Sequence, residues 1–154
     1  MKAIAIVDTS VLCEILAVPG KSSDQEGVVA ELERKVAAQE FLFLSTVAVV
    51  EAGNHIGHIG DGARRRRCAE ALVELVRNAL SGKSPFVALG LWDQATVHGW
   101  LDDFPDWASR GSGIGDLAMK KDWERQCALN RGRRVYIWSL DSHLAGFDRP
   151  PEVS

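Results

Sequence analysis

The chain has 154 residues, of which 46% are hydrophobic and 25% charged, and its formal net charge is −3 at pH 7. These values are typical of one globular domain with a sizeable core, so we expect a single domain over residues 1–154. The slight negative charge argues against indiscriminate binding to nucleic acid but is compatible with a local basic groove. No apolar run approaches the roughly 18 residues that span a bilayer, and the first apolar run is too short and too soon followed by an acidic residue for us to expect a signal peptide. We therefore expect no membrane association and a cytoplasmic location.

Strand and helix patterns alternate along the chain without a repeat or a long linker. Short apolar runs predict buried strands at residues 3–7, 41–44, 86–89 and 135–138. Helical spacing of apolar residues predicts helices at residues 10–18, 24–39, 46–59, 63–80, 93–107, 114–130 and 141–147. Pro105 makes the second half of the fifth of these helices doubtful. The alternation favours an α/β fold with three layers, α/β/α, around a parallel sheet of four or five strands.

The three cysteines, Cys13, Cys68 and Cys127, lie far apart and are odd in number. They lack the spacing of zinc ligands, and unpaired thiols are typical of a reducing compartment. We expect three free thiols.

Four acidic residues fall where such a sheet brings its strand ends together. Asp8 directly follows the first strand, and Asp141 follows the last of the four predicted strands. Asp116 opens a helix after a glycine-rich stretch, and Glu51 lies early in the helix after the second strand. Sites in open α/β sheets form beyond the carboxyl ends of the strands, so we expect the four carboxylates to share one site.

Repulsion within such a cluster indicates its chemistry. Two carboxylates about 4 Å apart repel by about 4 kcal/mol at an effective dielectric constant of 20. Four of them need protons, basic partners or a cation, and one or two Mg²⁺ or Mn²⁺ ions with oxygen ligands are the simplest solution. Such ions next to a phosphodiester activate water and stabilise the leaving oxygen, so the cluster indicates phosphoryl chemistry.

Four stretches carry a resemblance to a known family. In chain order, I-V-D-T-S, V-V-E-A-G, G-I-G-D-L-A and S-L-D-S-H-L-A-G-F resemble the motifs of PIN-domain ribonucleases, in particular the VapC toxins of toxin–antitoxin pairs. The resemblance implies a PIN-like fold and a Mg²⁺- or Mn²⁺-dependent endoribonuclease that leaves 5′-phosphate and 3′-hydroxyl ends. It also implies a homodimer, held inactive by a cognate antitoxin.

The resemblance assigns roles by position. Asp8, Asp116 and Asp141 would be catalytic metal ligands, and Glu51 would bind metal directly or through water. Hydroxyls beside the ligands would come from Thr9, Ser10 and Ser139, with Thr9 or Ser10 also capping the first helix. Contacts to RNA are expected from Lys120, Lys121 and His55.

Each acid also has a plain structural interpretation, as a helix cap, a first-turn acid or a surface charge. All four would have to hold at once, so we prefer the shared site. The remaining candidates are expected in solvent, with Asp148 close enough to replace a ligand: Asp102, Asp103, Asp106, Asp122 and Asp148. The dense basic run 64–67 is expected to be a solvated face, with phosphate contact as the alternative.

Two other functions stay open. One is a non-catalytic PIN-like module that binds RNA or protein. The other is a phosphatase of the haloacid dehalogenase type, which also carries an aspartate after its first strand. That chemistry requires a second aspartate two residues later, where this chain has Ser10.

Overall fold

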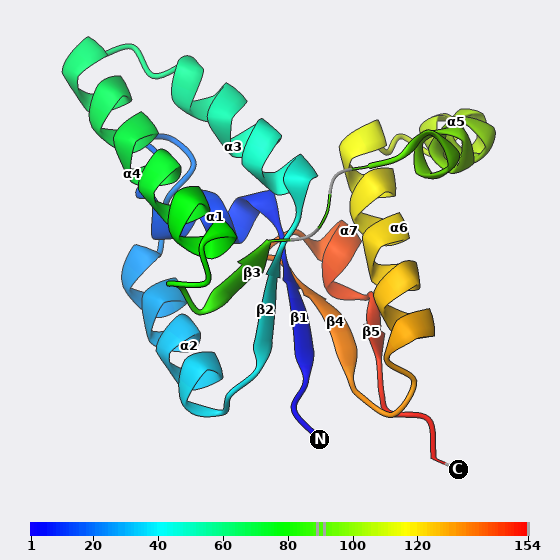
Figure 1. The fold of residues 1–154 in the computed structure, drawn as a ribbon. Coiled ribbons are helices and arrows are strands. Elements are labelled where there is room, and N and C mark those ends of the chain that lie inside the picture. Colours follow the sequence, from blue (N-terminus) through cyan, green and yellow to red (C-terminus); the bar gives the residue numbers. More distant parts are fainter. Residues whose placement is uncertain (89, 91, 154) are drawn as a thin grey trace.

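The computed structural model describes residues 1–88, 90 and 92–153, and a five-stranded sheet forms its centre (Figure 1). The strands are β1 (Ile4–Val7), β2 (Phe41–Leu44), β3 (Phe86–Ala88), β4 (Val135–Trp138) and β5 (Asp148–Arg149). Their order is β3-β2-β1-β4-β5, and β1 to β4 run parallel. The predicted α/β class and the four parallel strands are confirmed, although β3 ends at Ala88 and residue 89 of its expected range lies outside the described residues.

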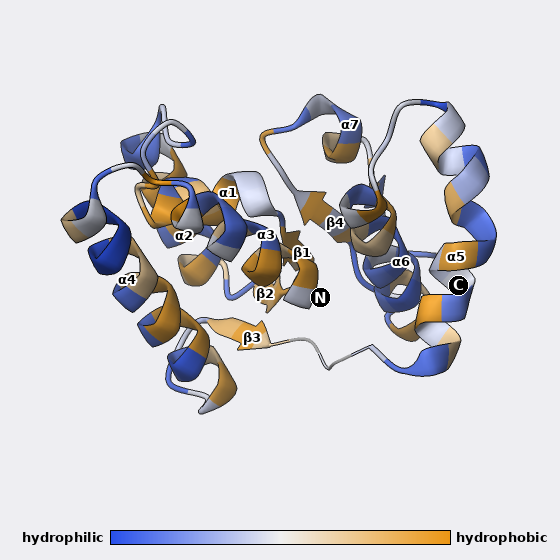
Figure 2. Ribbon diagram, turned by 90° about the horizontal axis from the view of Figure 1, so that it is seen from above, coloured by the Kyte–Doolittle hydropathy of each residue, from blue (hydrophilic) through white to orange (hydrophobic). Residues whose placement is uncertain are grey.

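Helices lie on both sides of this sheet. They are α1 (Thr9–Ile15), α2 (Gln25–Ala37), α3 (Thr46–Gly57), α4 (Gly62–Leu80), α5 (Gln94–Ser109), α6 (Ile114–Leu129) and α7 (Ser142–Ala145). Seen from above the sheet in Figure 2, α1, α2 and α4 lie on one side and α5 and α6 on the other. This arrangement is compatible with the expected three layers. In the described part of the chain, no helix combines the length and apolar character needed to cross a membrane.

The central strands are buried, as their sequences predict. All four residues of β1 are 1% exposed or less, and the four residues of β4 are also buried. β1 pairs with both β2 and β4, with Ile4 opposite Phe41 and Val135. Apolar side chains pack on both faces of β1 and β4. This packing fixes the position of the carboxyl end of each strand and of the residues that follow it.

The fifth strand corrects the expectation of a wholly parallel sheet. β5 runs antiparallel to β4, with Asp148 opposite Tyr136 and Arg149 opposite Val135. A parallel return needs a crossover of a dozen or more residues, and the chain between β4 and β5 holds only the four-residue α7. The chain therefore turns back beside β4, which also ends the expected helix 141–147 early.

Most of the other helices begin or end within a few residues of their predicted bounds, and local residues explain two of the differences. α1 ends at Ile15 and not at residue 18, because Ala17 adopts a left-handed conformation with φ 51° and Pro19 follows. α5 continues through Pro105 to Ser109. Proline removes one helical N–H, whose partner carbonyl belongs to the exposed Leu101, so water can reach the unpaired oxygen.

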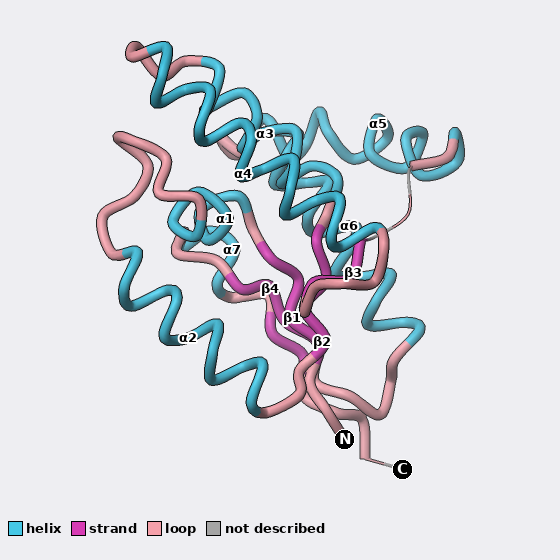
Figure 3. Tube along the Cα trace, turned by 60° about the vertical axis from the view of Figure 1, so that its left-hand side comes forward, coloured by secondary structure: helices cyan, strands magenta, loops and turns pink. Residues whose placement is uncertain are grey.

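The carboxyl ends of β1 and β4 lie at the point of the sheet where the strand order reverses. From β1 the chain adds β2 and β3 on one side and then returns to add β4 on the other. Such a switch point is where open α/β sheets form their sites. α3 and α4 lie side by side and extend beyond this edge of the sheet (Figures 1 and 3).

Candidate active site

Asp8 lies at the end of β1 and also begins α1. Its backbone N–H donates to the Trp138 carbonyl at 3.0 Å, which ties it to the end of β4. Its side chain is the N-cap of α1, a role expected for Thr9 or Ser10, since it accepts from the Ser10 N–H. The residue is 6% exposed, and its Oδ2 accepts hydrogen bonds from Ser10 Oγ at 2.8 Å and Ser139 Oγ at 2.7 Å. One hydroxyl from the first turn of α1 and one from the segment after β4 thus orient this carboxylate.

Glu51 reaches the same place from α3. Thr9 Oγ1 donates to Glu51 Oε2 at 2.7 Å, which joins α3 to the start of α1. The other oxygen, Oε1, lies against Gly115 in the first turn of α6. A Cβ atom at position 115 would lie 1.9 Å from Oε1, so this approach requires glycine. Glu51 therefore faces α1 and α6, as its predicted position on the apolar side of the helix indicates.

Asp116 and Asp141 complete the group. Asp116 lies in the first turn of α6. Burial raises its pKa, as do the negative charges of Asp8, Asp141 and Glu51, while His143 opposes the shift. Asp141 caps α7 by accepting from the His143 N–H at 2.9 Å. The charges of the other three acids thus act on Asp116, as expected if the four share a site.

A hollow of about 300 Å³ contains the four acids. Its lining is Asp8, Thr9, Ser10, Cys13, Lys21, Glu51, His55, Asp116 and Asp141. Within the described residues, no arginine, lysine or histidine forms an ion pair with any of the four carboxylates. Their mutual repulsion is therefore not relieved by a bonded cationic side chain.

The donor chemistry fits a hard divalent cation. Over residues 1–88, 90 and 92–153, no three acidic, histidine or cysteine side chains are arranged to hold a metal ion as they stand. However, Asp8 Oδ1 and Glu51 Oε1 accept no hydrogen bond from this part of the chain, so each carboxylate keeps one oxygen available. Four carboxylates with spare oxygens are the ligands that Mg²⁺ and Mn²⁺ prefer, and side-chain rotation would have to bring those oxygens together.

Two lysines predicted to contact RNA do not line the hollow. Lys121 on α6 pairs with Asp103 on α5. Lys120 lies 3.3 Å from Glu124 and above the Trp107 ring. Both therefore help to hold α5 and α6 together, whereas His55 does line the hollow.

One aspartate expected in solvent, Asp122, has other surroundings, whereas Asp148 is exposed as expected. Asp122 accepts a hydrogen bond from Ser45 Oγ at 2.7 Å, and burial raises its pKa, so the expectation of a solvated side chain was wrong. Asp148 forms a two-point ion pair with Arg134, with N–O distances of 2.9 and 2.7 Å. Because it lies on β5 opposite Tyr136, away from the hollow, it does not replace a ligand there.

Sequence reasoning missed two residues of the hollow, Cys13 and Lys21. Cys13 is 2% exposed, and burial raises its pKa to about 11, against the charge of Lys21. All three cysteines are free, as expected. Cys13 could have been found from its place one helical turn after Thr9, but no local pattern marks Lys21.

Comparisons with protein-family models, with curated proteins and with solved structures find no match to this chain. The geometry and chemistry of the hollow therefore carry the functional argument.

Proposed function

We propose that this protein is a metal-dependent endoribonuclease of the PIN type, which hydrolyses RNA phosphodiester bonds with Mg²⁺ or Mn²⁺. The observation that carries the proposal is the gathering of Asp8, Glu51, Asp116 and Asp141 around one hollow without a paired cation among the described residues. Such a cluster is unfavourable in isolation, and a bound cation would turn the repulsion into attraction.

The residues of the chain have separable tasks in this reaction. Asp8, Asp116 and Asp141 would hold one ion, and Glu51 would support a second ion or position the attacking water. When bound, such ions supply an activated water and stabilise charge on the leaving oxygen. The Thr9 hydroxyl orients Glu51 by donating to Oε2 of its carboxylate. The other oxygen, Glu51 Oε1, is left able to accept a proton from a water in the hollow.

The order of the four sequence motifs supports a more specific role. It favours a VapC-like toxin of a type II pair, active in the cytoplasm, with a cognate antitoxin and a second copy of the chain as partners. A haloacid-dehalogenase-like phosphatase is disfavoured because Ser10 occupies the position of its second aspartate and donates its hydroxyl hydrogen bond to Asp8.

The test is cleavage of RNA by the purified protein. We expect single-stranded RNA to be cut in Mg²⁺ or Mn²⁺ and to stay intact with a chelator, with 5′-phosphates on the products. RNA that binds but is never cut in either metal would contradict the proposal and favour a non-catalytic module.

A further inference from the structure

The loop between α1 and α2 is held in one conformation beside the hollow. Glu14, 2% exposed, accepts hydrogen bonds from Ser22 Oγ at 2.7 Å, from the Ser23 N–H at 2.8 Å and from the Asp24 N–H at 3.1 Å. Within the loop, the Lys21 N–H donates to the Val18 carbonyl at 3.0 Å. A buried carboxylate with several donors fixes the backbone around it, so the backbone of Lys21 is placed before any ligand arrives.

Among the described residues that line the acidic hollow, Lys21 is the one lysine or arginine. It is exposed, and no ion pair joins it to a described carboxylate. Its charge acts on Cys13 at the wall of the hollow. A lysine with this freedom, next to carboxylates that a metal would neutralise, is suited to bind a phosphate as a point charge.

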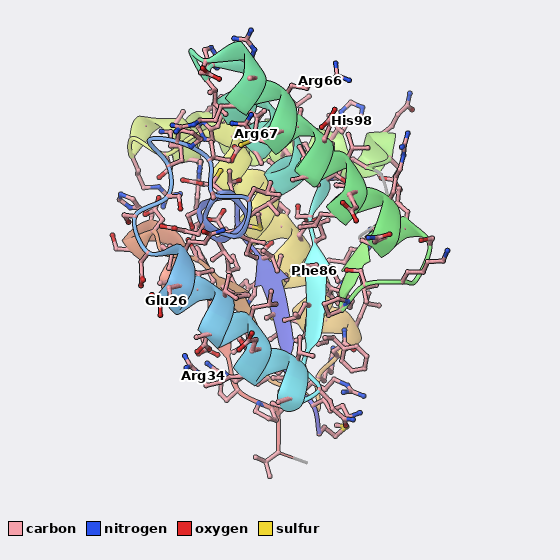
Figure 4. All side chains as sticks on the ribbon, turned by 90° about the vertical axis from the view of Figure 1, so that its left-hand side faces the viewer. Glu26, Arg34, Arg66, Arg67, Phe86 and His98 are labelled. Carbon is pink, nitrogen blue, oxygen red and sulfur yellow. The ribbon has the colours of Figure 1, made fainter. Side chains whose placement is uncertain are left out.

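The four arginines at the start of α4 have different surroundings. Arg65 donates to the Ile59 carbonyl at 2.8 Å, and Arg66 pairs with Glu70 at 2.8 Å. Arg64 and Arg67, in contrast, line a second hollow, and neither forms an ion pair with the rest of the described chain. Figure 4 shows Arg67 on the side of α4 near the loop and Arg66 on the other side.

The second hollow, of about 470 Å³, adjoins the first through the same loop. Pro19 and Ser22 line it together with Arg64 and Arg67. Ser22 directly follows Lys21 in the chain, and neighbouring Cα atoms are about 3.8 Å apart. The two hollows therefore share the α1–α2 loop, with Lys21 lining the acidic hollow and Arg64 and Arg67 lining the second one.

We propose that Lys21, Arg64 and Arg67 bind successive phosphates of the RNA strand as it leaves the acidic hollow over the α1–α2 loop. This inference rests on the proposed function. The strand thus exits on the α4 side of the hollow and not toward Lys120 and Lys121 on α6. Contacts to the phosphates of the RNA backbone add affinity without base preference and make binding depend on salt concentration.

The test measures binding of a labelled single-stranded RNA, in Mg²⁺, to the Asp116→Asn variant, which we expect not to cut it. Adding Lys21→Ala or Arg67→Ala should weaken binding about three- to tenfold and reduce the slope of log K against log salt by about 0.7 each. The matched controls are Arg66→Ala, the neighbouring arginine on the other side of α4, and Lys83→Ala in the turn after α4. Both controls should leave the slope unchanged, and thermal melts check that all variants fold.

The outcomes separate this inference from the function it rests on. If Asp116→Asn binds RNA and Arg66→Ala changes the salt slope as much as Arg67→Ala, the proposed path is wrong although the function stands. If adding Lys21→Ala to Asp116→Asn leaves RNA binding as tight as in Asp116→Asn alone, the path is likewise overturned. If the parent shows no saturable RNA binding, and the native chain cuts no RNA, the proposed function itself fails and the path with it.

Discussion

Replacing Asp8 by asparagine should lower the rate of RNA cleavage about a thousandfold while the protein stays folded. The amide removes a charged metal ligand, but asparagine is as good an N-cap as aspartate and can still accept from the Ser10 N–H. The Ser10 and Ser139 hydroxyls also keep an oxygen to which they can donate. The measurement is the single-turnover cleavage rate in Mn²⁺, with circular dichroism and a thermal melt to verify the fold.

Asp24→Asn is the matched control for this variant. Asp24 is the N-cap of α2, as Asp8 is of α1, but it is exposed and does not line the acidic hollow. It should cut RNA at the rate of the native chain. If the Asp8→Asn variant retains the native rate, Asp8 is a structural cap and not a ligand.

Gly115→Ala should reduce cleavage about a hundredfold through displacement of Glu51. The new methyl group would lie 1.9 Å from Glu51 Oε1, which is far inside contact distance, so the Glu51 carboxylate must move from the position in which Thr9 donates to it. Because the clashing atoms are the end of a flexible side chain that can turn away, we expect the free energy of unfolding to change by no more than about 1 kcal/mol. Denaturant melts and the cleavage rate measure the two effects.

Two further variants distinguish the clash from a general effect of alanine in a helix. Gly99 lies within α5, and no atom of the described residues lies within 4 Å of a Cβ added there, so Gly99→Ala should stabilise the protein by up to about 1 kcal/mol. Combining Gly115→Ala with Glu51→Asp shortens the clashing side chain and should not restore cleavage, since the shorter carboxylate does not reach the native position of the Glu51 carboxylate. If Gly115→Ala alone is as active as the native chain, Glu51 has no role that depends on its position.

The positions of the four acids could be predicted because each depends on local signals. Asp8 and Asp141 follow apolar strand sequences, Asp116 follows a glycine-rich helix start, and Glu51 is placed by helical phase. Each signal spans a few residues, and the parallel arrangement of β1 to β4 then collects the ends at one edge.

Other features depend on contacts between distant segments and could not be predicted in the same way. Lys21 reaches the hollow because Ala17 adopts a left-handed conformation and because the buried Glu14 holds the loop. The partner of Lys121 is Asp103, which depends on how α5 packs against α6. The direction of β5 follows from the shortness of α7, and a two-residue strand carries too little pattern to be recognised.

We propose that the four carboxylates can share one hollow because a divalent cation binds among them. Burial and the other three acids raise the pKa of Asp116, so the folded state holds that proton more tightly than the unfolded chain. The contribution of Asp116 to stability therefore falls as the pH rises through its raised pKa, and at neutral pH its charge is unfavourable without metal. Asp116→Asn removes that charge and should raise the melting temperature in chelator by about 2 °C.

The most direct test is therefore a thermal melt of the native chain and of Asp116→Asn, each with chelator and with saturating Mn²⁺. The native chain should gain about 5 to 10 °C on adding Mn²⁺, since a ligand of the folded state stabilises it, while Asp116→Asn should start higher and gain little. If Mn²⁺ leaves the native melting temperature unchanged, or raises that of both proteins equally, the hollow is not a metal site.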